Sequence, residues 1–434
     1  LSQIDTMRTV LRVWSCTFSS LAVLATFGQW AIMSQPTTQA LYDLHEYDGQ
    51  LFIASRFGVG TQVYASAAYD GSSFSYPNEL QSNNYGTCFV EHNNALLLGG
   101  AVWDQQTING VAQWNGSIWI AAPYNVGNAL PVAKLFSHGD TLYASGSFAT
   151  PYPGLAMHDG TQWNPMGAGL NGLAMDFAFF DGSLYACGWM YSSGSTPLNC
   201  ITRWTGSNWE DVGGGLGGGS NNIAYDMEVY NGELYVVGNF STAGGLLVDG
   251  IAKWNGANWS TLGSGSTTPQ SEEIRALAVT SQGLYVGGYF ASQDGQPFQN
   301  IAVWDGTAWS DPGGLPNPSH SVYSIAEYQG HIYLGTYNTS GTMDYGLLWR
   351  DSEVGIAEVP PQHVLVGPNP VQNTLTVTSM DAPVRALALY DAQGRLLRTT
   401  TLTTLPMNDL APGTYVLRTQ LEEGVAVHCV VKEE

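Results

Sequence analysis

The chain has 434 residues, with 13 lysine and arginine side chains against 35 aspartate and glutamate side chains, so its formal net charge is −22. This acidic surplus argues against nucleic-acid binding, because phosphate backbones are bound by lysine and arginine. Charged residues make up only 11% of the chain, whereas Gly (52), Trp (14) and Tyr (23) are abundant. Such a composition argues against coiled coils and helical bundles and favours short strands joined by turns.

The first 28 residues have the pattern of a leader. From Met7, two arginines precede a mostly apolar run over residues 13–27, and small residues end at Gly28. This is typical of a secretory signal peptide cleaved near Gly28. The alternative, a membrane anchor, needs about 20 apolar residues. No other segment has that length and apolarity, so we expect an exported mature chain with no transmembrane segment.

A Trp/Gly signature recurs between residues 29 and 352. It reads QWNGSIW, HDGTQW, RWTGSNW, KWNGANW and VWDGTAW, with a weaker copy, AYDGSSF, and a truncated one, LLW. A second element, such as LYVVGNF, lies between successive copies. The aligned glycines are 45, 44, 46, 50 and 50 residues apart, at Gly71, Gly116, Gly160, Gly206, Gly256 and Gly306. We count seven units.

Each unit divides into four predicted strands. The first and second strands are joined by a two-residue turn such as Asn231-Gly232, and the third and fourth by one such as Asn255-Gly256. Asn-Gly and Asp-Gly suit these hairpins because they accept the positive φ values that match strand twist. Two hairpins per unit, at a period of about 45 residues, are typical of β-propeller blades. The sequence therefore predicts an all-β fold with a seven-bladed β-propeller over residues 29–352.

The seventh unit stops at Trp349-Arg350 and lacks its fourth strand. The start of the mature chain, GQWAIM from Gly28, is similar to the fourth-strand stretch GTQWNPM at Gly160. We therefore expect the segment around Trp30 to complete the last blade, which would leave no open sheet edge.

These repeats resemble the kelch-like and galactose-oxidase-like propeller families. They are most similar to the LYVGGxF and IAxWDGxxW repeats of secreted bacterial proteins and fungal cortical marker proteins. The resemblance is specific for the fold and says little about function.

The composition changes after residue 352. Residues 353–363, with paired prolines, are predicted to be a linker, and residues 364–434 a small antiparallel, Ig-like β-sandwich. This region resembles the type A C-terminal sorting domain of Bacteroidota type IX secretion substrates. The matching residues are Pro368, Asn369 and Pro370, the stretch LYDAQGR, then Gly413, Tyr415 and Lys432. The resemblance implies recognition by the type IX secretion machinery and a cell-surface or extracellular location; the alternative is an ordinary sandwich with a binding role.

Candidate binding residues lie on the variable loops. Loops after the second and fourth strands emerge on one rim, opposite the tight turns, and loops on a rigid scaffold commonly carry binding residues. The ligand-binding candidates are Trp103, Asp104, Tyr124, Trp189, Asp294, Asp311 and Tyr345, with Tyr191, Asp249, Glu272, Glu273, His320 and Asp344 as further members of the set. Trp103 and Trp189 stand outside the repeat signature. We align Trp189 with Phe148, Phe240 and Phe290, which favours packing over stacking on a sugar ring.

The remaining patterns give local predictions. Cys187 and Cys200 lie on neighbouring strands and form either a disulfide or two buried thiols, while Cys88 and Cys429 are single. Residues 29–355 hold 26 acidic and 6 basic side chains, which indicates either solubility outside the cell or binding of calcium or a cationic partner. No calcium loop, zinc motif or nucleophile elbow occurs, so no cofactor is predicted.

The sequence favours an exported, non-enzymatic binding or adhesion module for an extracellular carbohydrate or protein. The alternative is a polysaccharide hydrolase or lyase that uses loop carboxylates, which leave no linear signature. A third interpretation is a structural spacer.

Overall fold

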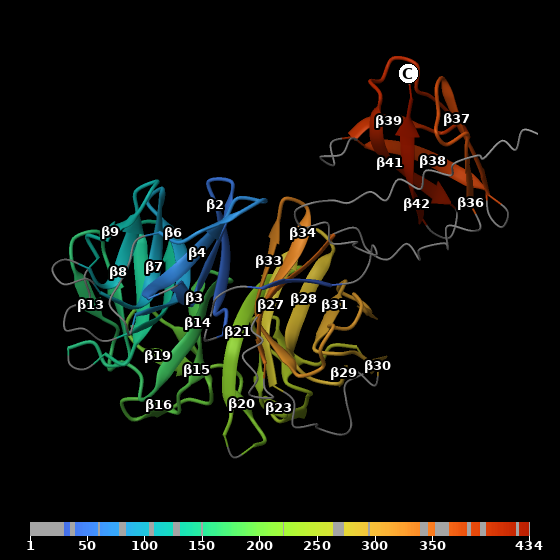
Figure 1. Ribbon diagram of the computed structural model, residues 1–434. Coiled ribbons are helices and arrows are strands. Elements are labelled where there is room, and N and C mark those ends of the chain that lie inside the picture. Colours follow the sequence, from blue (N-terminus) through green and yellow to red (C-terminus); the bar gives the residue numbers. More distant parts are fainter. Residues whose placement is uncertain are drawn as a thin grey trace, which may run out of the picture.

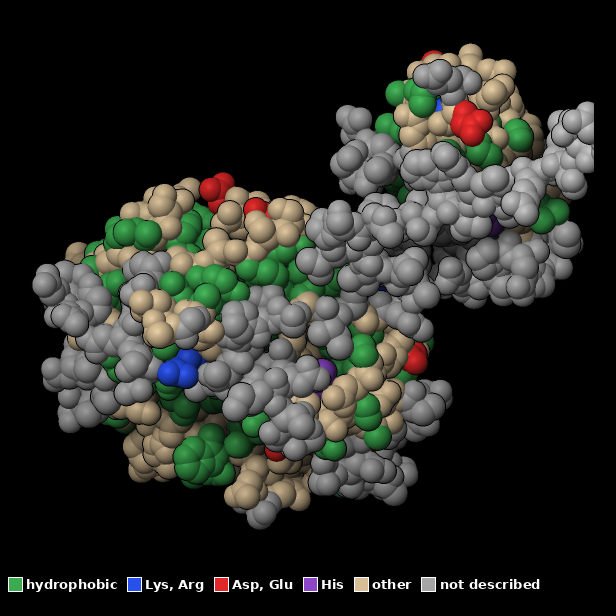
Figure 2. Space-filling view, in the orientation of Figure 1, with side chains coloured by type: hydrophobic (Ala, Val, Ile, Leu, Met, Phe, Trp, Pro, Cys, Tyr) green, Lys and Arg blue, Asp and Glu red, His purple; other side chains and the backbone are tan. Residues whose placement is uncertain are grey.

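The computed structural model describes residues 30–34, 40–59, 61–77, 84–103, 108–124, 131–148, 151–219, 221–263, 273–293, 296–338, 346–351, 364–379, 383–390, 396–421 and 425–433. The predicted leader and linker lie outside these ranges. Within them the fold is all-β and consists of many small antiparallel sheets without a helix (Figure 1). The described residues, whose side chains are coloured by type in Figure 2, accordingly offer no helix that could cross a membrane.

Seven four-stranded sheets are formed between residues 31 and 351 of the described chain. In the first six, the strands are joined in chain order; in the seventh, the outer strand comes from the N-terminus. They are sheet 1, β2 (Asp43–Tyr47), β3 (Gln50–Val59), β4 (Gln62–Tyr69) and β5 (Phe74–Ser75); sheet 2, β6 (Tyr85–His92), β7 (Ala95–Trp103), β8 (Asn109–Trp114) and β9 (Trp119–Ala121); sheet 3, β10 (Val132–His138), β11 (Thr141–Gly146), β12 (Leu155–His158) and β13 (Trp163–Pro165); sheet 4, β14 (Leu173–Phe180), β15 (Ser183–Trp189), β18 (Ile201–Trp204) and β19 (Trp209–Asp211); sheet 5, β21 (Ile223–Tyr230), β22 (Glu233–Asn239), β25 (Ile251–Trp254) and β26 (Trp259–Ser260); sheet 6, β27 (Glu273–Thr280), β28 (Gly283–Tyr289), β31 (Ile301–Trp304) and β32 (Trp309–Ser310); and sheet 7, β33 (His320–Tyr328), β34 (His331–Asn338), β35 (Gly346–Asp351) and β1 (Ala31–Ser34).

Short strand pairs decorate the links between second and third strands. They are β16 (Ser192–Ser193) with β17 (Thr196–Pro197), β23 (Thr242–Ala243) with β24 (Leu246–Leu247), and β29 (Ser292–Gln293) with β30 (Gln296–Pro297). β20 (Leu216–Gly217), from the link between sheets 4 and 5, adds a third strand to β23 and β24.

The tight turns follow the predicted chemistry. Asp48, Asp181 and Asn231 have φ values of 49°, 46° and 50°, and each precedes a glycine that also has positive φ. Positive φ at both central residues matches the twist of the flanking strands. The two-residue turns between first and second strands are therefore confirmed.

The signature tryptophans pair across the third and fourth strands and pack between sheets. Trp254 lies opposite Trp259, with ring centroids 5.2 Å apart, and Trp259 donates its indole N–H to the carbonyl of Val212, just after sheet 4, at 2.9 Å. Trp119 of sheet 2 likewise donates to Ser66 Oγ in sheet 1 at 2.8 Å. The repeated tryptophan thus joins each of these sheets to the one before it.

The N-terminal strand completes sheet 7, as predicted. Ala31 pairs with Trp349 and Ile32 with Leu348 in antiparallel register. The Trp30 indole donates to the Gly313 carbonyl at 2.7 Å, and the Arg350 guanidinium lies 5.4 Å from its ring centroid.

The first strands of neighbouring sheets contact one another. β6 contacts β2 and β10, β14 contacts β10 and β21, and β27 contacts β21 and β33. β33 of sheet 7 also contacts β2 of sheet 1. The first and last sheets therefore lie side by side, and all seven first strands follow one another through direct contacts.

The C-terminal region contains two further antiparallel sheets. One has β36 (Val364–Gly367), β37 (Thr374–Ser379) and β40 (Thr404–Pro406), and the other has β39 (Leu396–Thr400), β38 (Val384–Tyr390), β41 (Gly413–Leu421) and β42 (Val425–Lys432). Buried Leu375 of the first sheet and Leu387 and Leu417 of the second belong to one core. Asn369 of the Pro-Asn-Pro motif accepts the Val431 N–H at 2.8 Å, so this motif is fixed against β42.

Candidate functional site

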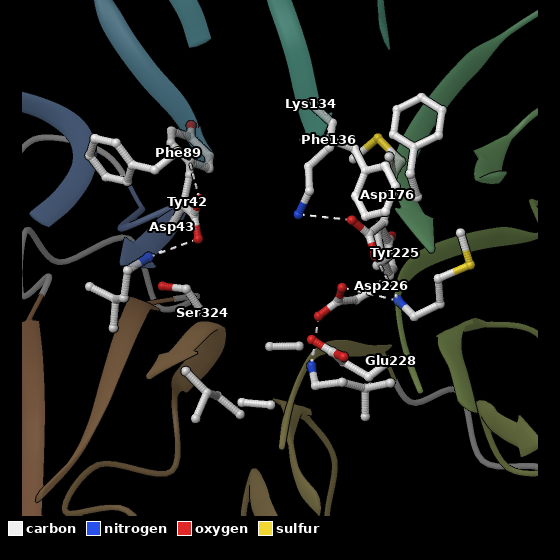
Figure 3. Close-up of a pocket in the computed structure, with 18 of the residues that line it drawn as sticks. Tyr42, Asp43, Phe89, Lys134, Phe136, Asp176, Tyr225, Asp226, Glu228 and Ser324 are labelled. Carbon is white, nitrogen blue, oxygen red and sulfur yellow. Dashed lines mark hydrogen bonds and ion pairs between the residues drawn. The ribbon is translucent and has the colours of Figure 1, made fainter. Parts of the chain in front are cut away.

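The first strands of the seven sheets enclose a cavity of about 980 Å³ (Figure 3). Its lining comes from β2, β6, β10, β14, β21, β27 and β33, together with Tyr42 just before β2. Pockets of roughly 300–1,000 Å³ are typical of small-molecule sites. The cavity is therefore the first candidate site of the described chain.

β-Bulges aim side chains into this cavity. Six first strands shift register near their start, for example between Ala224 and Asp226 of β21. A bulge leaves one residue outside the regular pairing and redirects its side chain. The redirected residues all line the cavity, and they are Thr87, Ala133, Met175, Tyr225, Arg275 and Tyr323.

One arc of the lining is aromatic and carries a fixed arginine. The Arg275 guanidinium lies 4.4 Å from the Tyr225 ring centroid and 4.6 Å from that of Tyr323, and it forms an ion pair with Glu273. Tyr42 continues the arc, with its centroid 6.4 Å from that of Tyr323. Two cation–π contacts and an ion pair hold the guanidinium in place. This arc offers flat ring faces and hydrogen-bonding groups to a ligand.

At the next position of the first strand, three aspartates link their sheet to its neighbour. Asp43 accepts the Phe89 N–H at 2.6 Å, and Asp226 accepts the Leu277 N–H at 2.7 Å. Asp176 accepts the Met227 N–H at 3.1 Å in the same way. The equivalent residues in the seven sheets are Asp43, Cys88, Lys134, Asp176, Asp226, Ala276 and Ser324.

Lys134 is the cation of this ring of equivalent positions. Its Nζ lies 2.8 Å from Asp176 Oδ1, and the Asp176 side chain is only 6% exposed. Burial alone would lower the pKa of Lys134, but Asp176, Asp43 and Asp226 raise it well above its ordinary value. Lys134 therefore stays charged and compensates several buried carboxylates at once.

Two acids beside it hold protons unusually tightly. Burial and the nearby Asp176 raise the pKa of Glu228 to about 7, although Lys134 opposes the shift. Burial and Asp176 also raise the pKa of Asp226 well above its ordinary value. In Figure 3, Lys134, Asp176, Asp226 and Glu228 converge on one side of the cavity. A carboxyl group that exchanges its proton near neutral pH has the property required of a general acid or base.

These acids do not make a metal site. Within the ranges that the structure describes, no three His, Cys, Asp or Glu side chains are arranged to hold a metal ion. The lysine and carboxyl groups of this cluster can exchange protons and form hydrogen bonds.

We expect Glu228→Gln to stabilise the protein at pH 8 relative to the unchanged chain, by at most about 3 kcal/mol. The pKa of Glu228 is about 7 when folded against an ordinary value of 4.5, so the folded state binds its proton more tightly. The free energy of unfolding therefore falls as the pH rises from 4.5 to 7, and the Gln variant does not show this decrease. Urea unfolding of both proteins at pH 5 and pH 8 measures this effect. If the two proteins differ in free energy of unfolding by the same amount at both pH values, Glu228 does not have a raised pKa in the folded state.

The exposure of Trp189 shows that its alignment with the other sheets needs correction. Its side chain is 54% exposed, whereas Phe240 and Phe290, with which we aligned it, are buried. The alignment was wrong by one residue, because fully buried Met190 occupies the position of Phe240 and Phe290. Trp189 instead corresponds to Asn239 and Tyr289, and Tyr289 is 46% exposed. The packing interpretation of Trp189 is therefore wrong.

The exposed indole is held in a defined orientation. Trp189 Nε1 donates to the Tyr191 hydroxyl at 2.9 Å, and the two rings meet edge to face at 85°. Asn171 Oδ1 accepts the backbone N–H groups of Tyr191 and Ser192 at 2.9 and 2.7 Å. Because the indole N–H is already satisfied, the ring face is the part left for a ligand.

Tyr191 of the predicted set contacts Trp189, whereas Tyr124, Trp103 and Asp311 have other surroundings. Tyr124 lies between the rings of His92 and His158, whose centroids are 5.2 and 5.0 Å away, near the opposite, tight-turn rim. Trp103 ends β7 half-buried, and its carbonyl accepts a hydrogen bond from Asn84. Asp311 accepts the Gly313 N–H at 2.8 Å within a turn. Asp104, Asp294 and Tyr345 lie outside the described residues, as do Glu272 and Asp344.

Cys187 and Cys200 are buried free thiols, the second of the two alternatives drawn from the sequence. The Cys200 thiol instead donates to the Asn222 carbonyl at 3.2 Å, which turns it away from a bridging position. Burial raises the pKa of Cys200 and of Cys88 to about 11, so these thiols are unreactive. Cys88 is single, as expected.

Sequence reasoning missed the cavity residues Lys134, Asp176, Asp226, Glu228 and Arg275. A signal was present, because Asp176 and Asp226 each stand five residues before the Asp181 and Asn231 turns. Reading backward from each turn would have aligned them.

Comparison with known proteins identifies the C-terminal region. Residues 366–433 match the family described as the secretion system C-terminal sorting domain. This type IX sorting domain directs the protein to the cell surface or the extracellular space and implies an interaction with the type IX secretion machinery. No curated protein matches the chain.

Solved structures resemble the chain in fold only. The extracellular domain of a protein described as a hybrid two component system of B. thetaiotaomicron has 10% sequence identity and a TM-score of 0.50; the match covers 94% of this chain and 58% of that one. The chain thus spans less than two thirds of that structure's length. The polysaccharide lyase Uly1 has 10% identity and a TM-score of 0.39, with 77% of this chain and 94% of that one covered.

Proposed function

We propose that residues 29–352 form a closed seven-bladed β-propeller that binds extracellular carbohydrate at the rim carrying Trp189. The observation that carries the proposal is the half-exposed Trp189 ring, fixed through Tyr191. The sorting domain supplies the location, because it places this rim outside the cell.

The propeller is supported by strand order and by the contacts of the first strands. Seven four-stranded sheets follow the repeat, and β33 of the last sheet contacts β2 of the first. Ser324 Oγ of sheet 7 also donates to the Leu41 carbonyl, just before β2, at 2.8 Å. The strand β1 adds the outer edge of sheet 7, so the N-terminus acts as the latch of the ring.

Carbohydrate is the ligand that best fits the exposed residues of this rim. Tyr289 occupies in sheet 6 the position of Trp189 in sheet 4, and exposed Leu246 and Leu247 come from the hairpin of sheet 5 between them. Exposed apolar side chains gathered across adjacent elements mark an interaction surface. Large aromatic faces with a polar edge suit sugar rings, which have apolar faces and hydroxyl rims.

A glycan array probed with the full chain tests this function. We expect Trp189→Ala to weaken binding of any retained glycan at least about tenfold, because a ring at the centre of a site commonly contributes that much. Phe179→Ala is the matched control, since Phe179 is an exposed aromatic residue on the opposite rim. Equal losses in both variants, or no retained glycan, contradict the proposal.

A polysaccharide hydrolase or lyase is the second candidate, and the cavity acids favour it. Among the loop carboxylates first suggested, Asp311 accepts a hydrogen bond within its own turn, and Asp104 and Asp294 lie outside the described residues. Glu228, with its pKa of about 7, and Asp226 instead face the cavity beside Lys134. Release of reducing ends or unsaturated sugars from polysaccharides by the full chain, lost in Glu228→Gln, would establish this activity; unchanged polymers argue for binding alone.

A further inference from the structure

The tight-turn rim carries its own pattern of side chains. In every sheet, one residue near the end of the first strand pairs with a buried leucine or isoleucine of the second. The seven pairs, in sheet order, are Glu46 with Leu51, Glu91 with Leu96, Ser137 with Leu142, Phe179 with Leu184, Val229 with Leu234, Val279 with Leu284, and Glu327 with Ile332. The identical register places the first members of these pairs at equivalent points of the rim.

One part of this rim is apolar. Phe179, Val229 and Val279 are 37%, 38% and 48% exposed and come from sheets 4, 5 and 6. Their strands β14, β21 and β27 contact one another in this order. Exposed hydrophobic side chains are individually ordinary, but equivalent ones on three adjacent strands form a continuous apolar arc.

The other part of the rim is acidic. Glu327, Glu46 and Glu91 come from sheets 7, 1 and 2, whose strands β33, β2 and β6 also contact in order. Glu46 and Glu91 line a second pocket of about 560 Å³ together with Tyr47 and Asp48, and none of these four lining residues is basic. Glu91 lies 3.3 Å from His45, and Glu327 accepts hydrogen bonds from Ser281. In these contacts the carboxylates of the acidic arc meet histidine and serine rather than lysine or arginine.

We propose that this amphipathic rim docks a polypeptide segment with a basic half and an apolar half. The basic half would face Glu46, Glu91 and Glu327, and the apolar half would cover Phe179, Val229 and Val279. Charge complementarity selects the occupant, since residues 29–355 carry 26 acidic and 6 basic side chains and attract cationic partners over a long range. This surface is separate from the carbohydrate rim and does not rest on the proposed function.

Other occupants fit the rim less well. A second copy of the chain would bring acidic arcs and like net charge together, which is unfavourable. A carbohydrate would find Val229 and Val279 where a broad aromatic face would be expected. An extended or helical segment with lysines on one side and leucines on the other satisfies both arcs.

The full chain can be titrated against a fluorescent synthetic peptide with lysines in one half and leucines in the other, followed by anisotropy. We expect Val229→Thr with Val279→Thr to weaken binding about tenfold, because threonine keeps the β-branched shape but removes apolar surface. We expect Glu46→Gln with Glu91→Gln to weaken binding by a similar factor and to reduce its dependence on salt. A peptide with glutamates in place of the lysines should not bind.

Trp189→Ala is the matched control, since it alters only the opposite rim and should leave peptide affinity unchanged. The proposal is wrong if the unchanged chain does not bind the peptide or if Trp189→Ala weakens binding as much as the rim variants. It is also wrong if only the Gln variants weaken binding, because attraction would then be non-specific. Thermal unfolding confirms that each variant is folded, and single threonine variants replace the double one if it is not.

Discussion

Replacing Lys134 with methionine is expected to lower the free energy of unfolding by about 3–5 kcal/mol at pH 8. The change leaves Asp176 buried without its ion pair, and Asp43 and Asp226 lose the cation that opposes their charge. Methionine keeps the length of the side chain, so lost packing contributes little. Urea unfolding at pH 8 measures the effect.

The loss should shrink as the pH falls to 5.5. The pKa of Glu228 is raised to about 7, so Glu228 takes up a proton in this range, and burial also raises the pKa of Asp226 well above its ordinary value. Protonation removes the buried charge that the missing lysine no longer compensates. A loss that is independent of pH would contradict an electrostatic origin.

Lys253→Met is the matched control for Lys134→Met. Its Nζ lies 2.7 Å from Glu233 Oε2, but the Glu233 side chain is 26% exposed, so solvent screens the pair. We expect a loss of at most about 1 kcal/mol there. Asp176→Asn in the Lys134→Met background should restore part of the stability, since it removes the unpaired charge. Equal losses in the two lysine variants would mean that Lys134 does not compensate the cavity acids.

These electrostatics bear on the choice between binding and catalysis. Lys134 fixes Asp176, whereas Glu228 retains a proton that can be exchanged near neutral pH. A cluster with one fixed and one exchangeable acid is built for proton transfer if a substrate reaches it. It serves structure alone if the cavity admits only water. The Glu228→Gln variant distinguishes these roles, because it removes proton exchange while keeping shape.

The repeat made most of the strand pattern predictable. A tryptophan every 44 to 50 residues beside an Asn-Gly or Asp-Gly turn leaves few folds open, because each unit must bury its indole against a neighbour. The truncated seventh unit likewise required a fourth strand from elsewhere, and the segment at Trp30 was the one that matched. These inferences rest on local turn chemistry and on burial, which the sequence records directly.

The inward orientation of the cavity residues could not be predicted from the sequence in the same way. Arg275 and Tyr225 point inward because β-bulges redirect them, and a bulge changes the strand alternation without leaving a glycine or proline at that point. Trp189 was misplaced for a related reason. Met190 stands where the other sheets have a buried phenylalanine, and it is as apolar as they are. Aligning the neighbouring aromatic Trp189 with those phenylalanines shifted the strand by one residue, which exchanged its buried and exposed positions.

Replacing Trp30 with alanine is expected to lower the free energy of unfolding by about 3–5 kcal/mol. The buried indole packs in one core with Leu315, Ile325 and Leu348, and it donates a hydrogen bond to the Gly313 carbonyl. Its loss also loosens β1, which leaves β35 as an open sheet edge. Trp189→Ala, which removes an indole of the same size from the surface, should cost no more than about 0.5 kcal/mol.

Strand complementation separates loss of packing from loss of ring closure. A chain that begins at residue 35 should melt at a lower temperature, and a synthetic peptide of residues 29–36 should restore the midpoint in a concentration-dependent way, because binding to the folded state stabilises it by mass action. The same peptide with alanine in place of Trp30 should restore it less. Full stability of the truncated chain without peptide would show that β1 is not needed to hold sheet 7 in place, and would leave the contacts between β33 and β2 to join sheets 7 and 1.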